Sequence, residues 1–144
     1  LDAQVQRLGW SEFDAIRVRT AAGGQVLAQN YKDTTSGAVG ADYAVNDRLT
    51  LRAGVQYDPT PTPDAERTAR VPDGDRWLYS LGATGRISDR TDLDVGLSYI
   101  DFARSDVRHN SVFFQGTPAA VTTTLRGDVQ AQGYVMAVGL RTRF

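Results

Sequence analysis

The side chains that could carry chemistry in this chain are mostly arginines and aspartates, and one group has the types needed for nucleophilic catalysis. Asp106, His109 and Ser111 lie within six positions of one another, and an acid, an imidazole and a hydroxyl are the parts of an acyl-transfer triad. Closeness along a loop does not set the geometry of a triad, so we expect no enzyme. No metal site or phosphate-cradling glycine loop is evident, and no cofactor is expected.

A second group of charged side chains lies between residues 58 and 76, around a cluster of prolines. Pro59, Pro61 and Pro63 each fix φ and remove a backbone donor, which stiffens a segment that does not need to join a sheet. Exposed ion pairs are common and individually weak, so we expect the charges to order a loop rather than to do chemistry. The charges that could pair are Asp58, Asp64, Arg67, Arg70, Asp73, Asp75 and Arg76.

Composition restricts the class of protein that holds these groups. The 144 residues carry 16 basic and 17 acidic side chains, a net charge of -1, so nucleic acid is not an expected partner. A mean hydropathy of -0.35 and the lack of a long apolar run argue against membrane-spanning helices. They do not argue against a membrane β-barrel, whose strands alternate polar and apolar residues. The chain begins at Leu1 without a leader, which indicates processing or a cut from something longer.

The elements that must position these side chains are strands, because apolar residues recur at every second position through most of the chain. Leu78 is the one apolar residue that falls on the polar side of its run. Residues 1–5 also alternate, and a less regular run at 12–19 slips in phase, which suggests a bulge. We count seven strands and find no helical periodicity, so we predict an all-β, antiparallel fold. The five clearest runs span residues 35–45, 49–57, 76–87, 93–99 and 134–144.

The connections between the predicted strands are sorted by length, which is typical of outer-membrane barrels with short periplasmic turns and long extracellular loops. On this basis the last strand runs from the extracellular side and ends in the periplasm at Phe144, a terminal aromatic of the kind that the outer-membrane assembly machinery recognises. Short turns are expected near 8–11, 46–47 and 88–91, and long segments near 20–33, 58–75 and 103–130.

Alternation alone does not say whether the apolar face meets a core or lipid. The polar face combines glycines with arginines and aspartates, as suits a wet lumen, and the aromatics lie near strand ends, where interfacial girdles belong. Two other interpretations stay open: a soluble lipid-binding barrel of lipocalin type, and a small structural or adhesive outer-membrane barrel, which needs an eighth strand or a pair within 107–126. The girdle residues would be Tyr43, Tyr57, Trp77, Tyr79, Tyr99 and Phe144.

Several short segments, in order and at consistent spacing, point to one family. They are Gly9-Trp10-Ser11-Glu12-Phe13, Tyr31-Lys32-Asp33, Tyr57-Asp58-Pro59-Thr60-Pro61, Pro72-Asp73-Gly74-Asp75-Arg76, Ser80-Leu81-Gly82 and Asp92-Leu93-Asp94-Val95-Gly96-Leu97-Ser98-Tyr99. Together they resemble the FadL family of outer-membrane channels for long-chain fatty acids and other hydrophobic compounds. The resemblance implies a barrel of about fourteen strands with an N-terminal plug. Residues 1–144 would then be the C-terminal half of one barrel, with the plug and early strands absent.

The resemblance also implies a function and a set of ligand-binding residues. A hydrophobic molecule such as a long-chain fatty acid would be taken up passively from the extracellular side and released laterally into outer-membrane lipid. In such channels basic residues meet the ligand carboxylate, which makes Lys32, Arg52 and Arg76 the candidates here. The alternatives are that Lys32 is a solvated loop residue and that the two arginines pair with Asp42, Asp58 or Asp94.

Overall fold

The chain folds almost entirely into β-strands, as the alternation predicts. The computed structural model describes residues 1–20, 23–68, 73–114 and 116–143, and no helix in these ranges is long and apolar enough to cross a membrane. One short 3-10 helix, η1, spans Trp10–Glu12. The strands are β1 (Asp2–Leu8), β2 (Ala15–Thr20), β3 (Gly23–Ala28), β4 (Thr34–Asn46), β5 (Leu49–Asp58), β6 (Arg76–Ser88), β7 (Thr91–Phe102), β8 (Ser105–Phe113), β9 (Val121–Val129) and β10 (Gln132–Thr142).

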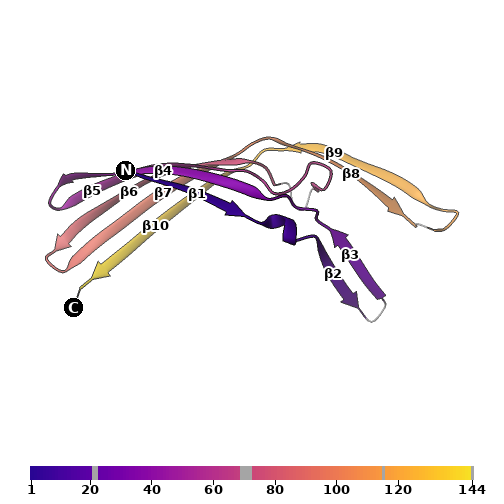
Figure 1. Cartoon of the computed structure of the whole chain (residues 1–144), viewed down its shortest axis with the longest axis horizontal. Coiled ribbons are helices and arrows are strands. Elements are labelled where there is room, and N and C mark those ends of the chain that lie inside the picture. Colours follow the sequence, from indigo (N-terminus) through magenta and orange to yellow (C-terminus); the bar gives the residue numbers. More distant parts are fainter. Residues whose placement is uncertain (21–22, 69–72, 115, 144) are drawn as a thin grey trace.

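Six of these strands form one antiparallel sheet in the order β1-β4-β5-β6-β7-β10. Strands β4, β5, β6, β7 and β10 have 13, 10, 13, 12 and 11 residues, which meets the 9 to 11 residues or so that a tilted strand needs to cross a bilayer. The hairpins β2–β3 and β8–β9 are separate two-stranded sheets. Figure 1 shows the main sheet as an arch, with both hairpins extending from the same end of it.

The two ends of the main sheet differ in their connections. At the end we call the turn end, β4 joins β5 through residues 47–48 and β6 joins β7 through residues 89–90, as predicted. At the opposite end, the loop end, the connections are long and run from β1 to β4, from β5 to β6 and from β7 to β10. The expected short turn at 8–11 is wrong. Residues 9–13 instead begin the long β1–β4 connection, which brings this connection to the loop end with the other two.

The count of seven strands also needs correction, because the main sheet has six and the two hairpins add four. The run at 12–19 slips in phase because η1 precedes β2, not because of a bulge. Strand β2 pairs with β3, which lies in a segment predicted as loop. The pair of strands sought within 107–126 exists as β8–β9, but it forms its own sheet instead of adding to the main one.

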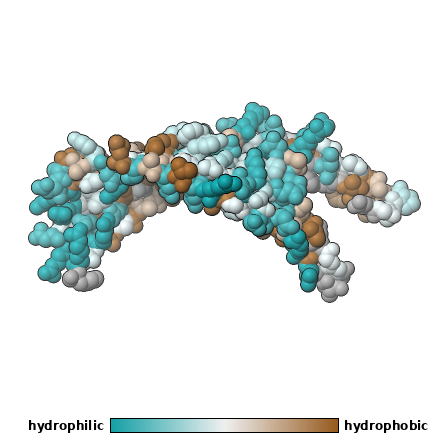
Figure 2. All heavy atoms as spheres, in the orientation of Figure 1, coloured by the Kyte–Doolittle hydropathy of each residue, from teal (hydrophilic) through white to brown (hydrophobic). Residues whose placement is uncertain are grey.

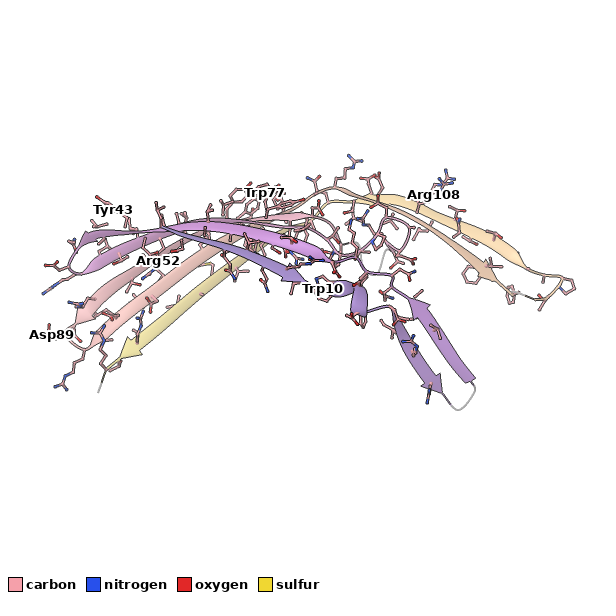
Figure 3. The ribbon with its side chains drawn as sticks, viewed as in Figure 1. Trp10, Tyr43, Arg52, Trp77, Asp89 and Arg108 are labelled. Atoms are coloured by element: carbon pink, nitrogen blue, oxygen red, sulfur yellow. The ribbon has the colours of Figure 1, made fainter. Side chains whose placement is uncertain are left out.

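The main sheet has two chemically different faces because its side chains alternate. On the apolar face, Leu81, Tyr134 and Met136 are 64%, 71% and 80% exposed. Among the described residues the buried set is mostly polar, and Val107 is its one hydrophobic member. In Figure 3, Tyr43 and Trp77 project from the convex side of the arch and Arg52 projects beneath it. Figure 2 shows hydrophobic side chains along the upper rim of the arch, over the main sheet. A soluble protein buries its apolar residues, so this distribution is reversed.

An aromatic row crosses the apolar face near the loop end. Ring centroids lie 4.9 Å apart for Tyr57 and Trp77, 6.3 Å for Tyr79 and Tyr99, and 5.2 Å for Tyr99 and Tyr134. The row therefore spans β5, β6, β7 and β10 at one level, which is the arrangement of an interfacial girdle. Four of the six predicted girdle residues gather there, namely Tyr57, Trp77, Tyr79 and Tyr99, and Tyr134 joins them. Tyr43 lies nearer the turn end, and Phe144 lies outside the described residues.

Candidate functional site

Most of the buried residues that the structure describes lie at the loop end, where the segment between β5 and β6 meets the strand ends. Asp75 is its central residue. The Asp75 carboxylate accepts hydrogen bonds from the Tyr57 hydroxyl at 2.7 Å and the Thr60 N–H at 2.9 Å, and the Ala103 N–H donates to the Asp75 carbonyl at 2.7 Å. Asp75 thus ties the aromatic row to the loop and to the end of β7.

The electrostatic environment of Asp75 keeps it charged. Burial raises the pKa of this carboxyl, but the hydrogen bonds from the Thr60 N–H and the Tyr57 hydroxyl act in the opposite direction. The positive charges of Lys32 and Arg67 add to these hydrogen bonds, and the net result holds the pKa of Asp75 below its ordinary value. An acceptor with a lowered pKa keeps its loop contacts across the neutral range.

Arg67 fastens the middle of the same loop. Its side chain is 8% exposed, and its Nε donates to the Asp73 carbonyl at 2.8 Å. Its Nη1 lies 2.9 Å from an Asp64 carboxylate oxygen and donates to the Asp106 carbonyl at 3.5 Å. The predicted ordering of the loop by ion pairs therefore holds for Arg67, whereas Arg70 lies outside the described residues.

A third set of contacts joins this loop to the segment that precedes β4. The Lys32 N–H donates to the Pro61 carbonyl at 2.9 Å, and the Asn30 side-chain amide donates to Glu66 at 2.7 Å. Thr60 and Thr62 are buried beneath these contacts. Residues 59–68 and 73–75, which we call the strap, are thus fixed between the start of β4 on one side and the start of β8 on the other.

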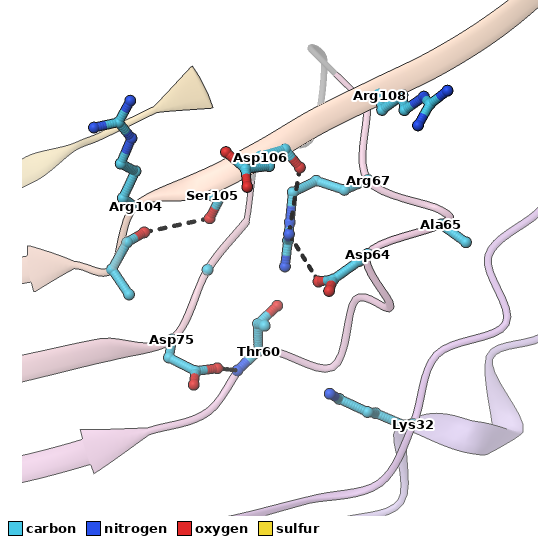
Figure 4. A pocket seen from close by; sticks show the side chains of 12 residues that line it. Lys32, Thr60, Asp64, Ala65, Arg67, Asp75, Arg104, Ser105, Asp106 and Arg108 are labelled. Atoms are coloured by element: carbon cyan, nitrogen blue, oxygen red, sulfur yellow. Dashed lines mark hydrogen bonds and ion pairs between the residues drawn. The ribbon is translucent and has the colours of Figure 1, made fainter. Parts of the chain in front are cut away.

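A cavity of about 550 Å³ opens beside the strap. In Figure 4 the Lys32 side chain extends toward it, and Arg67 lies across it from Lys32. Arg67 pairs with Asp64, and Arg104 pairs with Asp128 at 2.9 Å. Among the described residues, Lys32 and Arg108 are lining cations that form no ion pair. The lining residues are Lys32, Thr60, Asp64, Ala65, Arg67, Gly74, Asp75, Ala103, Arg104, Ser105, Asp106 and Arg108.

Arg52 and Arg76 lie on the polar face of the main sheet, and aspartates neutralise both. Arg52 Nε lies 3.4 Å from Asp42, and its Nη1 donates to the Thr84 hydroxyl at 2.6 Å. Arg52 is therefore an ion-pair partner in the middle of the sheet.

Arg76 is held in the same way at the loop end. Its Nε donates to Asp58 at 2.9 Å, and its Nη1 lies 3.7 Å from Asp73. Its guanidinium also lies 5.9 Å from the centre of the Phe102 ring. Arg52 and Arg76 therefore form ion pairs with Asp42 and Asp58, as the alternative interpretation expects. Lys32 is the candidate that lines the cavity.

The three residues of the triad pattern all lie on β8, but the side chains of His109 and Ser111 are outside the described part of the chain. Within the described ranges, no group of three or more histidine, aspartate or glutamate side chains is placed to hold a metal ion. Arg108 is the cavity residue that the sequence does not single out. It belongs to a segment predicted as loop, and the one available signal was its place in a weak alternation along β8.

The exposed apolar face, the aromatic row and the paired charges on the opposite face define this chain as part of the wall of a transmembrane β-barrel. The particular family follows from comparison with known proteins. A family model described as outer membrane protein transport protein (OMPP1/FadL/TodX) matches residues 1–144, and the chain belongs to this family.

Individual relatives agree with this assignment. The chain is 30% identical over 113 residues to the 47 kDa outer membrane protein of Pasteurella multocida, a match covering 77% of this chain and 26% of the relative. It is 31% identical over 93 residues to the long-chain fatty acid transport protein of Escherichia coli K12, covering 63% and 21%. The crystal structure of a Pseudomonas aeruginosa FadL homologue superposes with a TM-score of 0.85 at 29% identity, covering 97% of this chain and 31% of that one.

These findings confirm the predicted resemblance to FadL, the all-β class as part of a larger barrel, and the outer-membrane location. They leave no place for a soluble lipocalin-type barrel. The chain spans 21% to 31% of the length of these relatives, a smaller share than the half expected from the sequence. The apolar face of the main sheet therefore meets lipid, and the polar face lines the lumen.

Proposed function

We propose that the full-length protein takes up hydrophobic molecules with an acidic head group, such as long-chain fatty acids, across the outer membrane, and that residues 1–144 form the C-terminal part of its single barrel. The description of the family supports a role in transport, and one relative is named as a long-chain fatty acid transport protein. The process is passive and non-enzymatic, and it needs no cofactor. The loop end faces the outside of the cell, and the last strand engages the assembly machinery through Phe144.

The observation that carries this proposal is that Lys32 lines a cavity at the loop end and forms no ion pair with any residue that the structure describes. A carboxylate entering from outside meets this ammonium before it reaches the lumen, and a charge-assisted hydrogen bond would hold it there. Arg108, on β8, also lines the cavity and offers a second cation. Arg52 and Arg76 remain lumen residues on the route, but their charges are already matched by Asp42 and Asp58.

The hydrocarbon part of the ligand would then move into the lumen and leave laterally into the outer leaflet. The lateral exit and the plug belong to parts of the barrel outside residues 1–144. The contribution of this chain is the capture of the head group at the strap and the inner wall along which the tail lies.

Uptake of a labelled long-chain fatty acid by cells expressing the full-length protein tests the proposal. We expect uptake well above that of a deletion strain, and a Lys32→Met variant with lower uptake of the acid but little change for the alcohol of equal chain length. Arg7→Met is the control, because Arg7 is 76% exposed and lies outside the cavity. Equal uptake by the deletion strain and the wild type would contradict the proposed function.

A further inference from the structure

Two arginines face each other on the β8–β9 hairpin, which extends from the loop end of the main sheet. The register puts Arg108 on β8 directly opposite Arg126 on β9. Residues directly opposite in an antiparallel pair carry their side chains on the same face, with Cβ atoms about 4.5–5.5 Å apart. Like charges in this position repel and destabilise the hairpin, and an anion held between them removes that repulsion. We call Arg108 and Arg126 the arginine pair.

The acidic side chains nearest along the hairpin do not neutralise the arginine pair. Asp106 and Asp128 form the next cross-strand pair toward the main sheet. Asp128 lies 2.9 Å from the guanidinium of Arg104. Within the described part of the chain, no carboxylate lies within ion-pair distance of either member of the pair. Both members are exposed, so the pair presents two adjacent positive charges to the surroundings.

The next residues toward the tip of the hairpin add a neutral donor beside these charges. Asn110 and Thr124 lie opposite each other, and the Thr124 hydroxyl donates to the Asn110 side-chain oxygen at 2.9 Å. This bond uses the oxygen of the amide, whose nitrogen has two N–H groups to offer to another acceptor. Guanidinium groups bind phosphate through paired N–H donors, and an amide suits a hydroxyl. The face therefore has donors for a phosphate that is attached to a sugar.

The arginine pair lies on the outer side of the barrel wall. In Figure 3 the Arg108 side chain projects from the upper side of the hairpin, which is the side from which Trp77 projects on the main sheet. That side of the main sheet meets lipid. Arg108 also lines the cavity beside the strap, whereas Arg126 is not among the lining residues. The pair thus extends from the edge of the cavity to the outer surface.

The distance from the aromatic row indicates which membrane lipid can reach the pair. Arg126 precedes Tyr134 of the aromatic row by eight residues, which is roughly 26 Å of chain at about 3.3 Å per residue. The head-group layer of a phospholipid leaflet is only about 5–7 Å thick. A phosphate at the level of the pair therefore belongs to a lipid whose head group extends well beyond that layer, as the sugar core of a glycolipid does.

We propose that the arginine pair binds a phosphate group on the sugar core of an outer-leaflet glycolipid of the lipopolysaccharide type. The bound phosphate neutralises both guanidiniums and holds the β8–β9 hairpin against the surface of the membrane. This role goes beyond uptake, because the ligand is a resident lipid and not a transported molecule. A free phosphate ion has the same charge chemistry, but it brings no sugar hydroxyl for the amide of Asn110.

Binding of purified lipopolysaccharide to the delipidated full-length protein in detergent, followed by native mass spectrometry, tests the proposal. Arg126→Gln should weaken the affinity on the order of tenfold, as expected for the loss of one charged donor. The matched control is Arg19→Gln, because Arg19 is an exposed arginine on the other hairpin and stands opposite Gly24. The control should keep wild-type affinity. Unchanged affinity in Arg126→Gln, or an equal loss in both variants, would overturn the proposal.

Two further ligands tested on the wild type identify the source of the phosphate and need no variant to fold. Lipopolysaccharide stripped of its phosphates should bind on the order of tenfold more weakly, and inorganic phosphate at the same phosphate concentration should not displace the intact lipid. Equal binding of the stripped lipid would overturn the proposal. Displacement by inorganic phosphate would do so as well, because it would make the free ion the ligand.

Fatty-acid uptake by cells expressing Arg126→Gln separates this proposal from the proposed function. We expect uptake at the wild-type rate, because Arg126 lies outside the cavity that holds Lys32. A parallel loss of uptake and of lipopolysaccharide binding would assign the arginine pair to the transported carboxylate and would overturn the glycolipid site, while uptake as the function of the protein would stand.

Discussion

Arg76 illustrates how one side chain holds a strand and a loop together in this chain. Its guanidinium reaches Asp58 at the end of β5, Asp73 in the strap and the ring of Phe102 on β7. The Asp58 carboxylate is 14% exposed, so removal of the arginine leaves a largely desolvated charge without its partner. The same cannot be said of Arg7 and Asp33, which lie 3.4 Å apart with 76% and 33% exposure.

We therefore predict that Arg76→Ala lowers the unfolding free energy of the full-length protein by about 1–3 kcal/mol, the range for leaving a buried acceptor without its partner. Arg7→Ala should cost about 0–1 kcal/mol, as is usual for exposed pairs. Urea unfolding in detergent, followed by the mobility of folded and unfolded bands on a gel, measures both. Equal losses for the two variants would contradict the role given to Arg76.

Asp75 predicts a dependence of stability on acid pH. Its pKa in the folded protein is lower than in the unfolded chain, where an aspartate titrates at about pH 4. The carboxylate therefore contributes stability above about pH 4, and this contribution is lost as the pH falls through the folded-state pKa. Asp75→Asn should flatten the decline of stability below pH 4, because an amide has no proton to gain. Unfolding midpoints of both proteins across that range check this, and parallel curves would count against it.

The position of the strap depends on Gly74, whose backbone lies very close to the β7–β8 junction. A Cβ there would meet the Ser105 hydroxyl oxygen and would lie 2.9 Å from the Ala103 carbonyl oxygen. Neither the β7–β8 junction nor the strap has room for it, so even one methyl group must push them apart. Glycine at this position is what allows the strap to lie against the start of β8.

Gly74→Ala should thus destabilise the strap by about 1–3 kcal/mol, as overpacking does elsewhere. The signature is trypsin cleavage after Arg67, which is buried and bonded in the folded strap and becomes accessible when the strap lifts. Gly127→Ala is the matched control, because a Cβ at Gly127 meets nothing within 4 Å. Cleavage at the wild-type rate in Gly74→Ala would show that the close approach has no such effect.

The sequence predicts the elements of the main sheet well because a strand between lipid and lumen must alternate strictly. Strands β4 to β7 and β10 follow this pattern, and their short turns contain the turn-forming residues Asn46-Asp47 and Ser88-Asp89. The hairpin strands β3, β8 and β9 were not predicted from the sequence. Water reaches much of both hairpins, so their residues need not alternate between apolar and polar. Arg108 was missed for the same reason. Lys32 was predicted because basic residues meet the ligand carboxylate in the family that the sequence resembles and because Lys32 lies at the entry of a predicted strand.

Other parts of the site depend on the register between neighbouring strands, which the alternation within each strand does not determine. On the polar face Thr84 lies beside both Arg52 and Asp94, and this placement follows from the pairing of β5, β6 and β7. Leu78 looked like an irregularity in one strand. It becomes part of a surface only when the register sets it against Ile100.

The two faces of the main sheet predict a different loss of stability for the same substitution at adjacent positions. Leu97 lies on the apolar face and is 47% exposed, while Ser98 lies on the polar face beside Ser80. Leu97→Arg in the full-length protein should cost about 2–4 kcal/mol, because the charge meets lipid, and Ser98→Arg should cost much less, because the charge meets a wet lumen. Folding yields into lipid vesicles compare them, and the reverse order would invert the assignment of the faces.

Residues 1–144 taken alone should not behave as a closed barrel. Within the described part of the chain, β1 and β10 form the two edges of the main sheet, and lipid does not tolerate unpaired strand edges. We expect this piece, folded in detergent, to run at the same position on a gel with and without boiling. A heat-dependent shift in mobility would mean that the two edges can close on each other or on another copy.

The order of strands in the main sheet has a consequence for how the wall can be assembled. With the two hairpins set aside, strands that are neighbours in the main sheet are also neighbours along the chain. Each new strand therefore finds its partner already in place, and the search for long-range pairing that slows many β-proteins is avoided. Such a wall can grow one strand at a time along a single moving edge, and a loop can lengthen into a hairpin without disturbing the order in which the strands arrive.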